Sequence, residues 1–374
     1  MSSYKRSAVI IVVLGLSIFS QAYKKLDQNI KVGEEKSYKQ ITATDDIETE
    51  PALSPDLKWV AYVYKRKYLS GDIWLKSTVD NGEIRITKGR GIPPADFVPY
   101  SYGVRWAPDS ESLLYVSSHT GNYEVFLYYK GKNINLSNHP EWDGAPVFSP
   151  DGTKIAFVSA RDGNGEIYLI DCGREKITGE NVRNCPLIRL TKNEYLDVFP
   201  IFISNEEIIY TSRSDTMYNL YLLYKMGNEY KTKLLFGSED DERFVSISPD
   251  MMKIAFFCSS DICIFRHVNK IIAERDTQNQ YKDQLIRIKL PQGIYILPNG
   301  PQWLDNSRIV VVSLDPEKSL YSIEIESAKA EKLSLGTVEN YWIDIKKGVL
   351  AVAAFKFIDS LTFNDIYLFL QYKK

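Results

Sequence analysis

Carboxylate and aromatic side chains gather in several short polar segments of this 374-residue chain. Carboxylates that converge on one place can hold a cation or a basic protein segment by focusing negative potential. A suitably spaced pair of carboxylates can also act as general acid and base on a sugar. Tyrosine and tryptophan offer rigid contact area for a protein partner or a flat face for a sugar ring. The candidate binding residues are Asp46, Glu48, Tyr102, Trp142, Asp143, Tyr195, Asp197, Asp241, Glu242 and Tyr341.

Sequence signatures of catalysis are few. The chain has no Gly-x-Ser-x-Gly elbow, no His-Glu-x-x-His, no Cys-x-x-Cys and no glycine-rich phosphate loop. His119 and His139 fall in polar turns of neighbouring repeat units and could share a metal, although lone turn histidines are far commoner. Asp162 to Glu166 looks like a calcium loop but lacks the spacing that such a loop needs, so a plain turn is the better interpretation. We therefore assign no catalytic residue, metal or cofactor.

The four cysteines form two local pairs. Cys258 and Cys263 flank a short turn, whereas Cys172 and Cys185 bracket a long connection. Each pair could face across a hairpin, so we expect two disulfides, with four buried free thiols as the alternative.

A repeated sequence motif is expected to form the strands that position these residues. From Pro146 to Ser159 it consists of a short apolar segment, a Ser-Pro-Asp-Gly turn and an apolar run, and a further strand-like segment follows at 166–170. Ser/Ala-Pro-Asp turns recur at 56, 109, 151 and 250, and degenerate copies at 205, 305 and 344 bring the mean period to 48 residues. Four-stranded propeller blades repeat every 40 to 50 residues or so. Runs of β-branched and aromatic residues between Gly, Asp, Asn and Pro agree with strands.

Each repeat is expected to hold four antiparallel strands, named a to d from the centre outward. Seven a/b turns and seven c strands predict an all-β, seven-bladed β-propeller, with six blades plus an irregular cap as the alternative. The candidate binding residues then lie in the d/a loops, which meet on one rim of the ring. That rim is predicted to be acidic and aromatic, although ordinary polar loops would look the same.

The ends of the chain decide how the ring closes. The last c strand, 365–368, has no d strand after it, but a d-like strand at 38–42 precedes the first unit. We expect this N-terminal strand to complete the last blade, which removes an exposed edge. The propeller domain is therefore predicted to cover residues 38–374.

The Ser/Ala-Pro-Asp turns and the strands such as Ile167-Tyr168-Leu169 resemble the TolB-like β-propeller repeat. The resemblance implies the propeller fold over residues 38–374, but it is weak for activity because such repeats occur in scaffolds, protease gates and polysaccharide lyases. Authentic TolB carries an α/β domain ahead of its propeller, whereas only a short extension, residues 23–37, is expected here.

Residues 1–22 read as a signal peptide. Lys5-Arg6 is followed by an apolar run from Ala8 to Phe19 and a small-x-small cleavage site, Ser20 to Ala22. The apolar run is shorter than the roughly 20 residues of a spanning helix, so no membrane span is expected after cleavage; an uncleaved anchor is the alternative. We expect an exported monomer, periplasmic or extracellular. A net charge of −2 gives no basic field for nucleic acid.

Two function classes follow from these observations. The first is a non-enzymatic binding or scaffold propeller whose acidic, aromatic rim holds a protein partner of the cell envelope or a cation. The alternative is a carbohydrate-binding or carbohydrate-active propeller, a lyase or hydrolase, in which rim aromatics stack on a glycan and carboxylates such as Asp143 and Asp197 do acid/base work.

Overall fold

The computed structural model describes most of the chain between residues 31 and 370. The described ranges are 31–33, 36–44, 46–65, 71–87, 104–214, 217–237, 241–277, 281–290, 300–312, 320–333, 339–358 and 361–370. The predicted signal peptide lies outside them. No helix within these ranges is long and apolar enough to cross a membrane.

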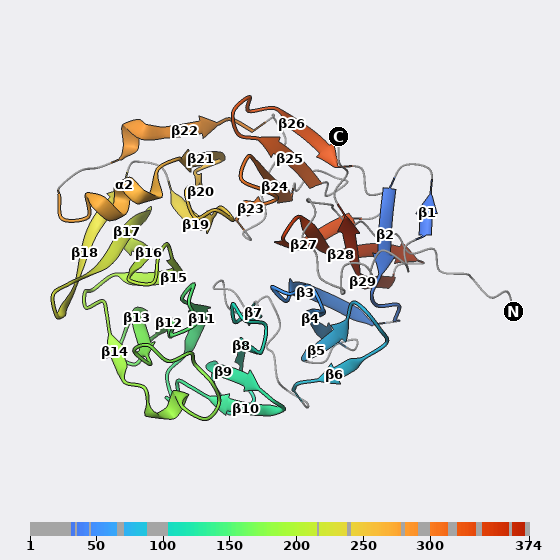
Figure 1. The fold of residues 1–374 in the computed structure, drawn as a ribbon, viewed down its shortest axis with the longest axis horizontal. Coiled ribbons are helices and arrows are strands. Elements are labelled where there is room, and N and C mark those ends of the chain that lie inside the picture. The colour runs from blue at the N-terminus through green and yellow to red at the C-terminus, as the bar shows by residue number, and fades with distance from the viewer. Residues whose placement is uncertain are drawn as a thin grey trace, which may run out of the picture.

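The described strands form sheets arranged as a ring around a common centre, and all but one of their strand pairs are antiparallel (Figure 1). Five of the sheets have four strands each, and the first strand of each lies innermost. They are β7 (Arg105–Trp106), β8 (Ser112–Ser117), β9 (Glu124–Tyr129) and β10 (Lys132–Asn135); β11 (Asp143–Phe148), β12 (Lys154–Ser159), β13 (Glu166–Asp171) and β14 (Leu187–Arg189); β15 (Leu196–Phe202), β16 (Glu207–Ser214), β17 (Met217–Met226) and β18 (Glu229–Phe236); β19 (Glu242–Ile247), β20 (Ile254–Cys258), β21 (Asp261–Phe265) and β22 (Leu285–Ile288); β23 (Gln302–Trp303), β24 (Arg308–Val312), β25 (Leu320–Glu324) and β26 (Ala330–Leu333).

A sixth sheet of nine strands closes the ring. It joins β1 (Lys31–Gly33), β2 (Lys36–Gln40), β3 (Ile47–Leu53), β4 (Trp59–Lys65), β5 (Asp72–Ser77) and β6 (Glu83–Arg85) to β27 (Glu339–Lys346), β28 (Val349–Ile358) and β29 (Leu361–Leu370).

The described residues thus form six sheets, the number of the alternative expectation, and the seven separate blades of the main expectation are not found. The reason is hydrogen bonding between β29 and β3, which pair in parallel at Asn364 and Ile47. This contact merges the strands at the end of the chain with those near its start. The closing strands are not an irregular cap, because β27, β28, β29 and β2 pair in antiparallel order.

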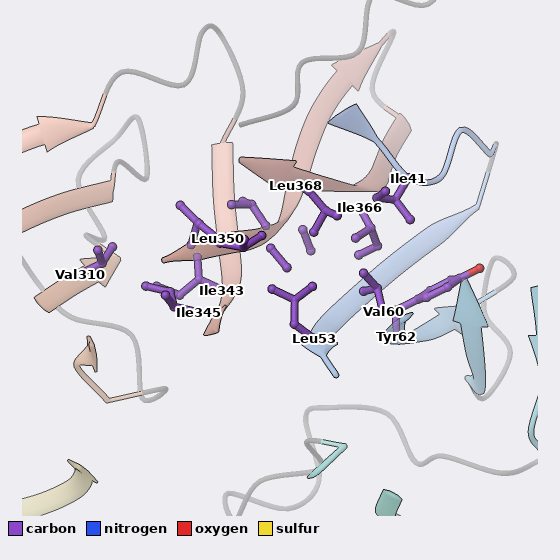
Figure 2. Close-up of a cluster of buried hydrophobic side chains, with 14 of the residues drawn as sticks. Ile41, Leu53, Val60, Tyr62, Val310, Ile343, Ile345, Leu350, Ile366 and Leu368 are labelled. Carbon is purple, nitrogen blue, oxygen red and sulfur yellow. The ribbon is translucent and has the colours of Figure 1, made fainter. Parts of the chain in front are cut away.

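The N-terminal strand pairs with the last strand, as the sequence predicts. Tyr38 of β2 lies opposite Phe369 of β29. Beyond β2, the side chain of Ile41 is buried with Leu53, Ile366 and Leu368 in the core of the closing sheet (Figure 2). The two ends of the chain are therefore held together by both backbone pairing and apolar packing.

The local sequence explains the sheets. In β12 every residue is buried, as expected for a strand with neighbouring sheets on both faces. The turn before β12 is held by Asp151, whose Oδ1 accepts hydrogen bonds from the Ser149 hydroxyl (2.6 Å) and the Thr153 amide (3.0 Å). Gly152 adopts a φ of 75°, which glycine tolerates without strain.

Both predicted disulfides are present, Cys172–Cys185 and Cys258–Cys263. The first closes the long connection after β13, which contains a 3-10 turn, η1 (Val182–Asn184). The corresponding connection after β21 contains the short helix α2 (Val268–Ala273) and a second 3-10 turn, η2 (Lys282–Gln284). Val268 and Ile271 of α2 are fully buried against the neighbouring sheets.

Candidate functional site

The loops that lead into the innermost strands lie at one end of the strands, together with the turns between the second and third strands of each sheet. This follows from antiparallel order, because the other turns must fall at the opposite end. We call the first end the rim, and in the two sheets β11–β14 and β15–β18 it includes residues 160–165, 190–195, 212–214 and 217–218. All candidate binding residues were assigned to rim loops.

Four of the predicted rim carboxylates are buried. They lie within the innermost strands β3, β11, β15 and β19, and their exposed fractions are 0% for Glu48, Asp143 and Asp197 and 4% for Glu242. The expectation that these groups present charge to a partner is therefore corrected. Their strands place them under the loops, where neighbouring sheets remove them from water.

Asp143 is balanced by one arginine. Arg161, in the turn after β12, brings its guanidinium to 3.3 Å from the carboxylate of Asp143 and stacks on Tyr168 at 4.7 Å. Burial raises the pKa of Asp143, and this effect outweighs the opposing influence of Ser159, Ser137 and Arg161. The ion pair therefore compensates part of the cost of burying the charge of Asp143.

Asp197 belongs to a second buried network. The Ser212 hydroxyl and the Asn193 amide donate hydrogen bonds to its carboxylate, the latter over 2.8 Å. The Asn193 backbone N–H also donates to Glu166 over 3.0 Å, and the Thr191 hydroxyl donates to that same carboxylate. Burial raises the pKa of Asp197 to about 6, with a further contribution from the negative charge of Glu166. Two carboxylates thus share a few donors between β13 and β15.

Arg189 supplies a positive charge to this second network through ion pairs with two carboxylates. Its guanidinium lies 3.0 Å from Glu166 and 3.1 Å from Asp162, in the turn that looked like a calcium loop. Asp162 also accepts a hydrogen bond from the Tyr168 hydroxyl. The turn interpretation agrees with this geometry, since these carboxylates face a guanidinium.

The acidic residues near β3 also accept hydrogen bonds from other side chains of the protein. Glu48 accepts hydrogen bonds from the hydroxyls of Thr42 and Thr44, and Asp46 accepts one from Tyr64. These bonds connect the segment after β2 to the first strand of the ring. We regard them as structural.

Asp241, like Asp46, is a partly exposed member of the predicted carboxylates. It pairs with Arg243 of β19 and accepts a hydrogen bond from the Tyr218 backbone N–H over 3.1 Å. Arg213 and Arg243 both lie against the ring of Tyr218, at 5.5 and 5.3 Å from its centroid. Guanidinium groups and tyrosine, rather than carboxylates alone, therefore occupy the rim between β16 and β19.

Of the two predicted aromatic residues whose side chains the structure describes, Tyr195 is the more accessible, with 45% of its surface exposed. Its loop is fixed because the side-chain amide of Asn164 donates to the backbone carbonyls of Asn193 and Tyr195. Trp142 is half-buried against the core of the same sheets. Tyr102 lies outside the described residues, as does the side chain of Tyr341, whose backbone belongs to β27.

The two rim histidines are engaged within their own turns. His119 lies 3.0 Å from the Ser117 hydroxyl and packs on Phe126, and the His139 ring accepts the backbone N–H of Glu141. Among the described residues, no three side chains of His, Cys, Asp or Glu gather as a metal site would require.

Sequence reasoning missed the arginines of the rim, Arg161, Arg189, Arg213 and Arg243, and the buried Glu166. One signal was available: an acid begins the third strand and a threonine follows the fourth, as in Asp72 with Thr87 and Glu166 with Thr191. That recurrence indicates a hydrogen bond repeated from sheet to sheet rather than a ligand site.

Comparison with known proteins agrees with the ring. The sequence profile of the TolB beta propeller domain matches residues 100–338, more than half of the chain. The chain belongs to this family. No curated protein sequence matches it.

Solved structures give the same fold. The TolB-like propeller is similar to an oligogalacturonate lyase from Vibrio parahaemolyticus, with 13% identity, a TM-score of 0.61, and 91% of this chain and 95% of that one covered. A manganese complex of an oligogalacturonate lyase gives 11% identity and a TM-score of 0.62, with 92% and 96% covered. TolB from Acinetobacter baumannii is 18% identical with a TM-score of 0.49, over 77% of this chain, and this chain spans 66% of the length of that TolB. At these identities the likeness to the two lyase structures shows the fold alone.

Proposed function

We propose that this chain is an exported, non-enzymatic binding propeller that presents its rim to a protein partner in the cell envelope. The observation that supports the proposal best is Tyr195, a tyrosine 45% exposed on a loop that Asn164 holds in place. A rigid, exposed aromatic side chain is the type of residue that contributes most to protein interfaces.

The buried rim carboxylates form ion pairs and hydrogen bonds within the protein, which favours a binding function over acid/base catalysis. Asp143 is paired with Arg161, and Asp197 accepts hydrogen bonds from Ser212 and Asn193. A carboxylate buried under its own loop cannot easily reach the proton of a substrate. The ring then acts as a rigid platform for contacts made by its loops.

Export to the periplasm or the extracellular space is part of the proposal. Both cysteine pairs are joined as disulfides, which persist in oxidising compartments. The predicted cleavage after Ala22 can be tested directly by N-terminal sequencing of the mature protein from its source.

A carbohydrate ligand is the second candidate. It is favoured by two aromatic residues of the rim, exposed Tyr195 and half-buried Trp142, which belong to loops that lead into the strands β15 and β11 of neighbouring sheets. Aromatic faces of this kind could stack on sugar rings. Oligogalacturonate is the substrate named for two structural relatives, and it is the first glycan to test.

The deciding experiment is a capture of proteins from the source cell's envelope extract on the immobilised chain. Tyr195→Ser should abolish retention of the partner, and Met226→Ser should not. Met226 is a matched control because it is 48% exposed and ends β17 at the opposite end of the strands. Equal retention by both variants would refute a rim-mediated interface. Retention of nothing, together with binding or cleavage of oligogalacturonate, would favour the carbohydrate function.

A further inference from the structure

Two arginines share one tyrosine at the rim between the sheets β15–β18 and β19–β22. Arg213 is the cross-strand neighbour of Tyr218 in the β16–β17 hairpin, and Arg243 comes from the innermost strand of the next sheet. Their guanidinium carbons lie 5.5 and 5.3 Å from the ring centroid of Tyr218. Stacking on an aromatic face holds a guanidinium plane in place and leaves its N–H edge available.

Within the part of the chain that the structure describes, only one of the two arginines has a carboxylate partner. Among the described residues, Asp241 alone forms an ion pair with either arginine, and that pair is with Arg243. Arg213 is exposed and makes no ion pair there; its ring contact is with Tyr218. Arg243 keeps 41% of its side chain exposed despite its partner. An oriented and accessible guanidinium is thus left for a ligand.

We propose that Arg213, Tyr218 and Arg243 form a binding site for the carboxylates of an acidic protein segment. This inference rests on the proposed function, because it gives the chemical class of the partner that the rim binds. Guanidinium groups recognise carboxylates through two parallel N–H···O bonds, a geometry that an ammonium group does not offer. The partner is therefore expected to carry Asp or Glu where it meets the rim.

A protein segment fits this cluster better than a nucleic acid. The whole chain carries a net charge of −2, so no extended field would attract a phosphate backbone. Met217, which is 39% exposed and begins β17, adds apolar surface at the same end of this sheet. Tyr195 belongs to the same end of the sheet, because Leu196 pairs with Arg213.

The test uses the folded chain and a fluorescent peptide that contains four consecutive glutamates, with the glutamine version as the uncharged control. Fluorescence anisotropy at low salt should show binding of the glutamate peptide and its loss as salt is raised. Arg213→Gln and Arg243→Gln should each weaken binding by about tenfold, the loss of one charge-assisted contact. Tyr218→Leu should also weaken it, whereas Tyr218→Phe keeps the ring and should retain most of the affinity.

Arg174→Gln is the matched control, because Arg174 is an exposed arginine in the connection after β13, at the opposite end of the strands. Equal binding by Arg213→Gln and Arg174→Gln, or equal binding of the two peptides, would overturn the proposal. Binding of a short single-stranded DNA as tightly as the glutamate peptide would also overturn it, since the site would then recognise anions in general. If a partner is captured through Tyr195 and Arg213→Gln does not reduce its retention, the proposed function stands and the arginine site fails. If the glutamate peptide binds through Arg213 but no partner is captured, the arginine site stands and the proposed function fails.

Discussion

Asp143 begins the strand β11 and Asp151 lies in the turn after it, and their surroundings shift their pKa values in opposite directions. At the rim, burial raises the pKa of Asp143 despite its ion pair with Arg161. At the opposite end, burial acts in the same sense on Asp151, but hydrogen bonds from Ser149 and Thr153 outweigh it and lower the pKa.

The same contrast extends around the ring. The pKa is also lowered at Asp56, Asp250 and Asp305, which lie in turns equivalent to that of Asp151, and it is raised at Asp197 on the rim. The turn aspartates stabilise backbone geometry as charged acceptors. Asp143 and Asp197 at the rim are instead difficult to ionise and depend on a few partners, so the two ends should respond differently to mutation and to pH.

Removing Arg161 should have the largest effect. Arg161→Ala leaves Asp143 buried without its cation, and breaking a buried ion pair from one side typically costs about 3–5 kcal/mol. Urea unfolding at pH 7 measures this loss. Adding Asp143→Asn should restore part of the free energy of unfolding; if it restores none, stacking on Tyr168 rather than the charge explains the loss.

Asp197 should make stability fall as pH rises. Its pKa, about 6 in the folded chain, exceeds the ordinary value of 3.8, so folding takes up a proton between these values. Its favourable contribution is complete below about pH 4 and is lost as pH rises through about 6, a change of about 3 kcal/mol at most. Asp197→Asn cannot ionise, so the free energy of unfolding of this variant relative to wild type should increase between pH 4.5 and pH 7.5. A pH-independent difference would contradict the raised pKa.

Asp151 should show the opposite dependence with a smaller amplitude. Because its folded pKa is lowered, its contribution is present above the ordinary value and disappears as pH falls through the folded pKa. Asp151→Ala removes the acceptor of Ser149 and Thr153 and should cost about 1–2 kcal/mol at pH 7. Unfolding titrations at pH 7 and pH 3 should show that cost shrinking in acid; an undiminished cost would mean that the charge is unimportant.

The surface ion pair between Lys58 and Asp56 should contribute least to the free energy of unfolding. Lys58 lies 3.1 Å from Asp56 but is 51% exposed, and exposed pairs contribute little. Lys58→Ala should change the free energy of unfolding by less than about 0.5 kcal/mol. A larger loss would show that this end depends on ion pairs as well as on turn hydrogen bonds.

The sequence predicts the regular parts of this molecule well. The Ser-Pro-Asp turns, the four-strand units, both disulfides and the pairing of the N-terminal strand all depend on local chemistry or on a repeated pattern. The number of sheets depends on a contact between β29 and β3, which no repeat pattern encodes.

The candidate site was harder to predict for a different reason. A polar segment in a sequence does not reveal which of its residues turn inward, so the buried Asp197 and the exposed Tyr195 looked equivalent. Arg213 and Tyr218 face each other across the β16–β17 hairpin, but Arg243 comes from the next sheet, and no sequence spacing relates it to them. The packing of the two sheets brings Arg243 to the other two residues.

The pairing of β2 with β29 also has a consequence for the order of assembly. Tyr38 meets Phe369 across almost the whole length of the chain, so β2 is made early and its partner late. During synthesis or export the intermediate sheets can form from neighbouring strands, whereas the closing sheet must wait for residues near 370. Contacts between such distant residues form slowly because a long loop must first be closed. Until then both β2 and the last hairpin expose open edges, so arrival of the final strand sets the moment at which the ring becomes resistant to aggregation and proteolysis.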